Sequence, residues 1–208
     1  MSVTKKLSWL IAVLLVMTSL TACDMPMKII GTIPEPEETV KAFFDSVCSG
    51  NFAESDRYLS GVSLSMKKPI DGDFAQKLYH YLIQSYRYQI NGEVTSDQLN
   101  ASCSVDFTAL NMNLLSGDLK KESTRIGKNY VSEKKEGFVQ ETDGAYELSD
   151  EGAVNVAAEA LDSLLQSSDN YRSTKTYEIA MKYSGGKWQI ILPEELFYAI
   201  CGGFDLSE

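Results

Sequence analysis

A strict alternation of apolar and polar side chains runs from Leu99 to Ala109. Its odd-numbered positions hold Leu, Ala, Cys, Val, Phe and Ala, and its even-numbered positions hold Asn, Ser, Ser, Asp and Thr. Because successive side chains of a β-strand point to opposite faces of the sheet, this pattern predicts one long, half-buried strand whose odd-numbered residues face the core. Such a strand needs partner strands along its edges and a layer that covers its apolar face.

Two further patterns supply the partner strands. Residues 86–91 alternate in the same way ahead of the long strand, and the segment that follows them, with Gly92, is suited to a hairpin. Near the C-terminus, residues 177–183 and 188–192 alternate on either side of Gly185-Gly186, and glycine readily adopts the positive φ angles of a tight hairpin. We therefore predict an antiparallel sheet of about four strands.

Helical spacing dominates the first part of the domain. Pro36 and two acidic residues open a helix whose apolar residues recur at i, i+3, i+4 and i+7, and Gly50 is placed to end it. A second short helix is expected over Phe52–Leu59, with Asn51 as its cap, and a third from about Asp73 to Ser85. The apolar residues on one face of this third helix are Phe74, Leu78, Tyr81 and Leu82.

Residues 111–148 carry the least regular pattern. Leucines spaced for a helix are interrupted by Gly117 and Gly127, and a further helix is expected from Ser149. Its expected inner face consists of Val154, Ala157, Leu161, Leu164 and Leu165. This order of elements predicts an α+β fold, in which N-terminal helices pack on the sheet, helices are inserted between the two strand pairs, and a short helix ends the domain.

The N-terminal stretch has the order of a secretory signal peptide. Lys5 and Lys6 precede an apolar run from Leu7 to Met17, which is too short to span a bilayer because a spanning helix needs about 20 apolar residues. The run ends in Leu20-Thr21-Ala22-Cys23, which is similar to the bacterial lipobox, and this similarity implies lipidation of Cys23 after cleavage. An ordinary signal peptide that ends near a cysteine is the alternative.

These patterns divide the chain into a signal peptide (1–22), a tether (23–35) and a single α+β domain (36–208). Each methylene group of an acyl chain that is buried in the bilayer contributes about 0.8 kcal/mol to the free energy of membrane binding, and the sum over one chain gives only marginal, reversible attachment. Two or three fatty chains on Cys23, palmitate among them, give stable attachment. We expect a protein that is anchored to the cell membrane by lipid and faces outside the cytoplasm.

The charge of the chain narrows its partners. The chain has 19 Lys and Arg against 29 Asp and Glu, and removal of residues 1–22, which contain two lysines and no acid, changes the formal charge from −10 to −12. Phosphates and anionic membrane surfaces repel so acidic a domain, so no nucleic-acid partner is expected.

Residues that build metal and redox sites are scarce. Besides Cys23 the chain contains Cys48, Cys103 and Cys201, with no Cys-x-x-Cys motif, and a single histidine, His80. A zinc site is built from about four such ligands, so no metal site and no cofactor are expected. With Cys23 lipidated, the other three cysteines cannot all pair within one chain, and either one disulfide or buried free thiols fit the sequence.

Two stretches carry a resemblance to a known fold family. Residues 36–44, Pro-Glu-Glu-Thr-Val-Lys-Ala-Phe-Phe, followed by Gly50-Asn51-Phe52 and a second helix, resemble the opening of nuclear transport factor 2-like (cystatin-related) domains. The C-terminal part of the domain is similar to Gram-positive bacterial lipoproteins of that class, many of which have unknown function. The similar stretch consists of residues 185–190 and a short helix that ends at Gly202-Gly203. The resemblance implies a cone in which a curved sheet wraps around helices and leaves a pocket.

Tyrosines are the main candidates for ligand contacts, because tyrosine combines apolar area with a hydroxyl group that suits small amphipathic ligands or peptides. The aromatic residues on the elements that would surround a pocket are Tyr79, Tyr81, Tyr86, Tyr88, Tyr177, Tyr183 and Trp188. The candidates chosen among them are Tyr81, Tyr86, Tyr88, Tyr177 and Tyr183. Packing in the core is the alternative for each. The resemblance implies a carboxylate or a His–Asp pair in the pocket of the family's enzymes, but His80 is placed to point partly outward and Asp106 lies on the polar side of its strand.

The sequence contains no nucleophile–base pattern, so we expect no catalytic residues and no enzyme activity. We expect instead a binding or interaction module at the cell surface. Its expected partners are membrane lipid, held through acylated Cys23, and either a cell-envelope protein or a small amphipathic ligand. The alternative is a small-molecule enzyme or ligand carrier that uses the cone-shaped cavity.

Overall fold

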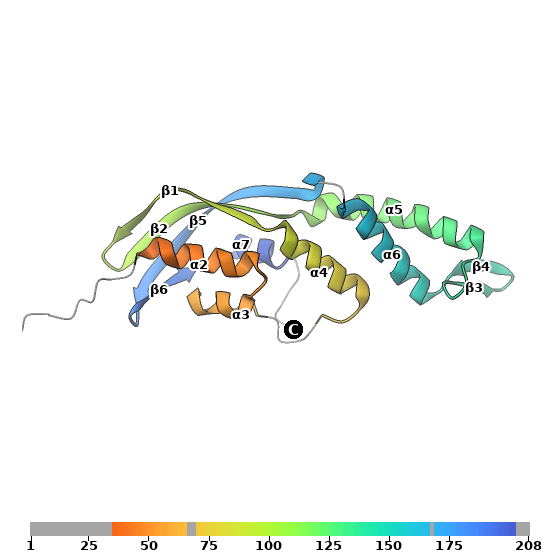
Figure 1. Cartoon of the computed structure of the whole chain (residues 1–208), viewed down its shortest axis with the longest axis horizontal. Helices are drawn as coiled ribbons and strands as arrows, with labels where there is room; N and C mark the ends of the chain where they lie inside the picture. Colours follow the sequence, from red (N-terminus) through yellow and green to blue (C-terminus); the bar gives the residue numbers. More distant parts are fainter. Residues whose placement is uncertain (1–34, 66–69, 167–168, 203–208) are drawn as a thin grey trace, which may run out of the picture. The chain divides into compact units, whose positions relative to one another are not determined.

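A computed structural model of the chain describes residues 35–65, 70–166 and 169–202. The predicted signal peptide, Cys23 and the tether up to Pro34 lie outside the described residues. The described elements follow the order α2, α3, α4, β1, β2, α5, β3, β4, α6, β5, β6 and α7 (Figure 1).

A four-stranded antiparallel sheet confirms the predicted pairing of the strands. The strands, in spatial order, are β1 (Arg87–Asp97), β2 (Asn100–Leu110), β5 (Arg172–Ser184) and β6 (Lys187–Ile191). The odd-numbered residues of β2 from Ala101 to Ala109 are buried, whereas its even-numbered residues up to Thr108 are partly or fully exposed. Leu99 was expected to face the core, but it lies in the turn between β1 and β2 and is 50% exposed, so that expectation is wrong.

Helices cover the apolar face of this sheet. The helix α2 (Pro36–Cys48) contacts β1 and β6, and α4 (Asp73–Ser85) contacts β2. The predicted apolar stripe of α2 is confirmed, because Val40, Phe43, Phe44 and Val47 are all 0% exposed. The ring of Phe44 stacks on Tyr88 of β1. The second predicted helix is divided into α3 (Phe52–Ser55) and a 3₁₀ turn (Asp56–Tyr58), and α7 (Glu194–Ile200) follows the sheet.

An inserted helical segment separates the two strand pairs, as the sequence predicts. It contains α5 (Met112–Glu133), a hairpin of β3 (Val139–Thr142) and β4 (Ala145–Leu148), and α6 (Asp150–Leu165) (Figure 1). Ile126, Tyr130, Val156 and Ala160 form a small core within it. The hairpin was not predicted, because both of its faces are largely exposed and no alternation of apolar residues marks it. Its one local signal is Asp143-Gly144, where both residues have positive φ angles.

Gly152 allows the backbone of α6 to pack closely against the residue that precedes the hairpin, Phe138. A Cβ atom at this position would lie 2.0 Å from the carbonyl oxygen of Phe138, so only glycine allows the two backbones to approach. The face that α6 buries against α5 consequently contains Val156 and Ala160. The predicted inner face is therefore corrected at Val154, which is 49% exposed, whereas Leu161 is buried as expected.

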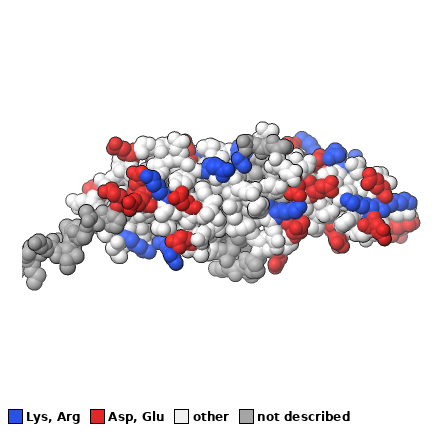
Figure 2. Space-filling view, viewed as in Figure 1, with Lys and Arg blue, Asp and Glu red and all other residues white. Residues whose placement is uncertain are grey.

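The α+β class, the inserted helices and the short C-terminal helix are thus confirmed. Within the described ranges, no helix is long and apolar enough to cross a membrane. The same residues contain no group of three or more His, Cys, Asp and Glu side chains placed to hold a metal ion. Figure 2 shows Lys and Arg interspersed with Asp and Glu on the face in view.

Candidate functional site

An apolar pocket of about 210 Å³ lies beside α4. The largest share of its wall comes from α4, through Phe74, Ala75, Leu78, Tyr79 and Leu82. The rest of the wall consists of Phe52 of α3, Leu64 and Ile70 of the loop, and Ile200 and Cys201 at the end of α7. Apart from Tyr79 and Cys201, every lining residue has a purely hydrocarbon side chain, so the pocket presents an almost entirely apolar surface.

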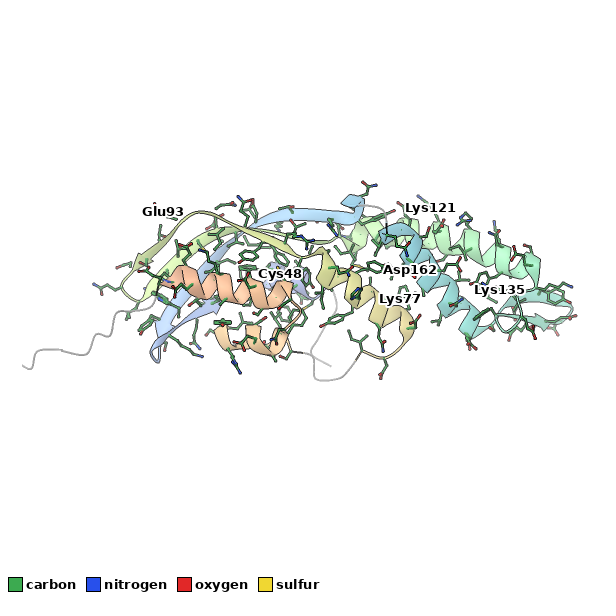
Figure 3. The ribbon with its side chains drawn as sticks, in the orientation of Figure 1. Cys48, Lys77, Glu93, Lys121, Lys135 and Asp162 are labelled. Atoms are coloured by element: carbon green, nitrogen blue, oxygen red, sulfur yellow. The ribbon has the colours of Figure 1, made fainter. Side chains whose placement is uncertain are left out.

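The two sides of α4 make different contacts. Residues three and four positions apart share a helix face, and this spacing brings Ala75, Leu78 and Tyr79 to the pocket. On another side of the helix, Lys77 and Tyr81 both contact Asp162 of α6, and Lys77 and Asp162 point toward one another in Figure 3. Lys77 Nζ lies 2.6 Å from Asp162 Oδ2, and the Tyr81 hydroxyl donates to Asp162 Oδ1 at 3.0 Å. Polar contacts therefore hold α4 against α6 while its apolar residues line the pocket.

The part of the wall that contains Leu64 depends on Asp56. The carboxylate of Asp56 accepts hydrogen bonds from the Leu64 backbone N–H at 2.6 Å and from the hydroxyls of Ser63 at 2.6 Å and Ser65 at 2.5 Å. Partial burial acts to raise the pKa of Asp56, but the hydrogen bonds from Ser63, Ser65 and two backbone amides outweigh it and hold the pKa below its usual value. The charged carboxylate thus fixes the loop that carries Leu64, which is 1% exposed.

Tyr86, which lies between α4 and β1, is hydrogen-bonded to the part of the wall that comes from α7. This side chain is 1% exposed, and its hydroxyl donates a hydrogen bond to the backbone carbonyl of Ile200. Burial raises the pKa of Tyr86 far above its ordinary value, so the hydroxyl remains protonated and able to donate. The contact positions Ile200 and Cys201 at the pocket.

Tyr79 is the lining residue with a polar group at the end of a ring. The ring lies edge-on to Phe52, with 6.3 Å between the ring centroids, and burial raises the pKa of the hydroxyl. Among the residues that the structure describes, no hydrogen-bond partner is found for this hydroxyl. No buried polar side-chain atom in that part of the chain lacks a partner, so the Tyr79 hydroxyl is not sealed inside the protein.

The helix α7 also borders a second hollow, of about 310 Å³, together with the ends of β2 and β5 and the start of α5. Phe107 and Tyr177 contribute apolar surface to it, and the ion pair between Lys175 and Glu195 lies among its lining residues. This hollow is more open and more polar than the pocket beside α4. The apolar pocket is therefore the stronger candidate for a binding site.

Three of the tyrosines predicted from the sequence make contacts within the protein. Tyr86 lies in the core and Tyr81 binds Asp162, as described above. The hydroxyl of Tyr88 donates to Asp45 Oδ1 at 2.7 Å. Desolvation by burial and the hydrogen bond to Asp45 both raise the pKa of Tyr88.

The other two predicted tyrosines lie apart from these. Tyr177 is 8% exposed and lines the second hollow, whereas Tyr183 packs edge-on against Trp188 beside the hairpin turn. The structure thus does not bring the five tyrosines together around one pocket.

The two titratable side chains considered for catalysis lie outside the apolar pocket. His80 is exposed on α4, and its Nε2 atom lies 2.7 Å from the Gln84 amide nitrogen. Asp106 accepts a hydrogen bond from Thr176 at 2.6 Å on the polar side of the sheet. Each therefore has a partner away from the pocket lining.

Part of the pocket lining could be predicted from the sequence. Phe74, Leu78 and Leu82 were recognised as the apolar face of a helix, and all three line the pocket. Tyr79 was grouped with the aromatic residues around an expected pocket but was not chosen as a ligand contact, and Ala75 was not assigned to that face. The sequence signal for the pocket was Ala75, a small residue beside the larger apolar residues of α4. Its small side chain leaves open a volume that a larger side chain would fill.

Comparisons with known proteins give one match. No family model matches the chain, and no curated protein matches it. Among solved structures, the crystal structure of a candidate lipoprotein (ycdA) from Bacillus subtilis subsp. subtilis str. 168 has 19% sequence identity and a TM-score of 0.37. The match covers 79% of this chain and 47% of that chain, so this chain spans about half of that protein's length.

Proposed function

We propose that the protein is an extracytoplasmic binding module, anchored by lipid at Cys23, whose domain accepts an apolar group of a ligand in the pocket beside α4. The pocket is the observation that carries the binding role. Apolar surface that stays uncovered forgoes the favourable free energy of burial, about 25 cal/mol per Å². A fold that leaves about 210 Å³ open, between walls held by Asp56 and Tyr86, supports the presence of a ligand there.

The placement outside the cytoplasm rests on the N-terminal sequence. The basic residues, the short apolar run and the ending Leu20-Thr21-Ala22-Cys23 support cleavage and lipidation. The same proposal includes a nuclear transport factor 2-like cone, which is supported by helices α2 and α3 and by a four-stranded sheet covered by helices on its apolar face. A cell-envelope protein or a small amphipathic molecule would carry the bound group.

The nature of the lining supports binding over catalysis. The described wall of the pocket contains no carboxylate, imidazole or amine that could act as a general acid or base near neutral pH. We therefore propose that the protein is not an enzyme. The ligand-carrier alternative uses the same pocket and differs only in whether the ligand is later released to another partner.

Metabolic labelling with a clickable palmitate analogue tests the anchor. The wild-type chain is expected to be labelled and recovered with membranes, and Cys23→Ala is expected to be unlabelled. A wild-type chain that remains unlabelled and is recovered from the cytosol at full length would overturn the proposed location.

Thermal unfolding with and without benzene tests the binding role. The full chain in phospholipid vesicles is expected to gain thermal stability in benzene, because a ligand that binds only the native state stabilises it. Ala75→Phe is expected to fill the pocket and to lose this gain. The matched control is Ala153→Phe, which places the same side chain at an exposed position of α6. An equal gain for all three chains, or a gain for none, contradicts the proposal.

A further inference from the structure

We propose that the pocket beside α4 selects an uncharged group of one or two rings that carries one polar atom, and that this atom binds the hydroxyl of Tyr79. The inference rests on the proposed binding function and names the chemistry of the ligand. Four observations on the described residues support it: the volume, the aromatic lining, a wall without charged side chains, and a Tyr79 hydroxyl for which no partner is found.

The volume sets the size of the group. An apolar cavity of about 150 Å³ lined by Leu, Ile and Phe stays dry and binds benzene. The pocket here, at about 210 Å³, is larger and has a similar lining. Sites for drug-sized molecules begin at roughly 300 Å³. The pocket therefore has room for one ring or a small fused pair, and it is too small for a whole sterol or a diacyl lipid.

The aromatic lining favours a ring over a flexible chain. Phe52, Phe74 and Tyr79 contribute three rings to the wall, and the rings of Phe52 and Tyr79 already meet edge-on. Aromatic rings prefer edge-to-face or offset arrangements, which favour a further ring by more than its buried area alone. A flat ligand also loses fewer internal rotations on binding than an alkyl chain of similar volume.

The described wall of the pocket offers no partner for an ion. No Lys, Arg, His, Asp or Glu lines the pocket among the residues that the structure describes. Asp56 is close in sequence to the Leu64 loop, but its carboxylate already accepts bonds from Ser63, Leu64 and Ser65. A charge surrounded by the described lining would lose its hydration without gaining a partner there, which is far more costly than the burial of a neutral group.

The Tyr79 hydroxyl supplies one polar contact. It can donate or accept, so it can pair with an N–H, a hydroxyl or a carbonyl of the ligand. Since this hydroxyl has no partner among the described residues, a ligand with one polar atom gains a hydrogen bond without breaking another. A purely hydrocarbon ring would bind through apolar contacts only.

Equilibrium dialysis of the full chain in phospholipid vesicles tests this selection, with benzene, indole and indole-3-acetate as probes and protein-free vesicles as the blank. Indole is expected to bind at least tenfold more tightly than the anion. Tyr79→Phe is expected to weaken indole binding about fivefold and to leave benzene binding unchanged, because it removes one hydrogen bond and no apolar surface. Ala75→Phe is expected to remove the binding of all probes, and Ala153→Phe to remove none.

The outcomes separate this inference from the function on which it rests. If indole-3-acetate binds as tightly as indole, or Tyr79→Phe leaves indole affinity unchanged, the assigned ligand chemistry is wrong. In that case, benzene binding that Ala75→Phe abolishes would leave the binding role intact. If benzene does not bind the wild-type chain, or binds Ala75→Phe equally well, the binding function and the ligand chemistry are both wrong.

Discussion

The carboxylate of Asp56 lies 2.6 Å from the backbone nitrogen of Leu64, and this contact joins the turn after α3 to the wall of the apolar pocket. A charged group near the surface thereby fixes an apolar side chain that is 1% exposed. Since several donors converge on one carboxylate, the loop and the pocket wall depend on its charge.

Asp56→Asn is expected to lower the free energy of unfolding by about 2 kcal/mol at pH 7, because the donors lose a charged acceptor. The pKa of Asp56 is lowered in the folded chain, so its contribution is present above the unfolded pKa of about 3.9 and is lost as the pH falls through the folded pKa. The difference between wild type and variant should therefore narrow below about pH 4. Urea unfolding of both chains at pH 7 and pH 3 measures this difference in the free energy of unfolding. Asp97→Asn, at the end of β1, serves as the control, and a gap independent of pH would contradict the prediction.

Gly152→Ala is expected to destabilise the chain by about 2 kcal/mol or more, because the added Cβ would meet the Phe138 carbonyl oxygen and force the hairpin away from α6. Gly117→Ala is the matched control. It lies in α5 with nothing within 4 Å of the added Cβ, so it should stabilise the helix by up to about 1 kcal/mol. Thermal unfolding compares the two, and a stable Gly152→Ala variant would contradict the packing of α6 described here.

Tyr86→Phe is expected to cost about 1–2 kcal/mol, because it leaves the buried carbonyl of Ile200 without its donor and removes no apolar area. Tyr183→Phe provides the comparison, since Tyr183 is half-buried and packs on Trp188 through its ring. Denaturant unfolding of both variants gives the two costs. Equal costs would show that the Tyr86 hydroxyl does not hold α7.

Cys103 is expected to resist alkylation at ordinary pH. Burial, with a further contribution from Glu178 and Glu37, raises the pKa of this thiol to about 11, and the side chain is 4% exposed. Only the thiolate reacts, and at pH 8 it amounts to about a thousandth of the population. The rate at which iodoacetamide alkylates Cys103 in the folded chain, measured by mass spectrometry, should therefore increase as the pH approaches 11. Rapid modification at pH 8 in the native state, and not only in urea, would contradict the burial of Cys103.

The fold class could be predicted because several helices and strands have apolar residues on one side only, and in the structure that side is covered by another element. The third predicted helix, Asp73–Ser85, has the bounds of α4, and the alternation that ends at Ala109 became β2. The β3–β4 hairpin had no such pattern, because both of its faces meet water. Its only local mark, Asp143-Gly144, identifies a turn and not the strands beside it.

The candidate site was less predictable, because its walls come from residues far apart in the chain. Nothing near Tyr86 in the sequence indicates that its hydroxyl meets the carbonyl of Ile200, and nothing near Tyr81 indicates Asp162. These long-range contacts engage Tyr81 and Tyr86 within the protein and leave the hydroxyl of Tyr79 without a partner among the described residues.

By itself, the sequence determined the helices and strands that have one apolar side, such as α2, α4 and β2, because this property depends on spacing over a few residues. It did not determine the β3–β4 hairpin, both of whose faces are largely exposed. Only the tertiary structure decided where apolar sides meet without filling the space between them. The pocket beside Ala75 is enclosed by side chains from α3, α4 and α7, which are far apart in the sequence. Its volume depends on how these elements pack together, so it cannot be recognised in any single stretch of the chain.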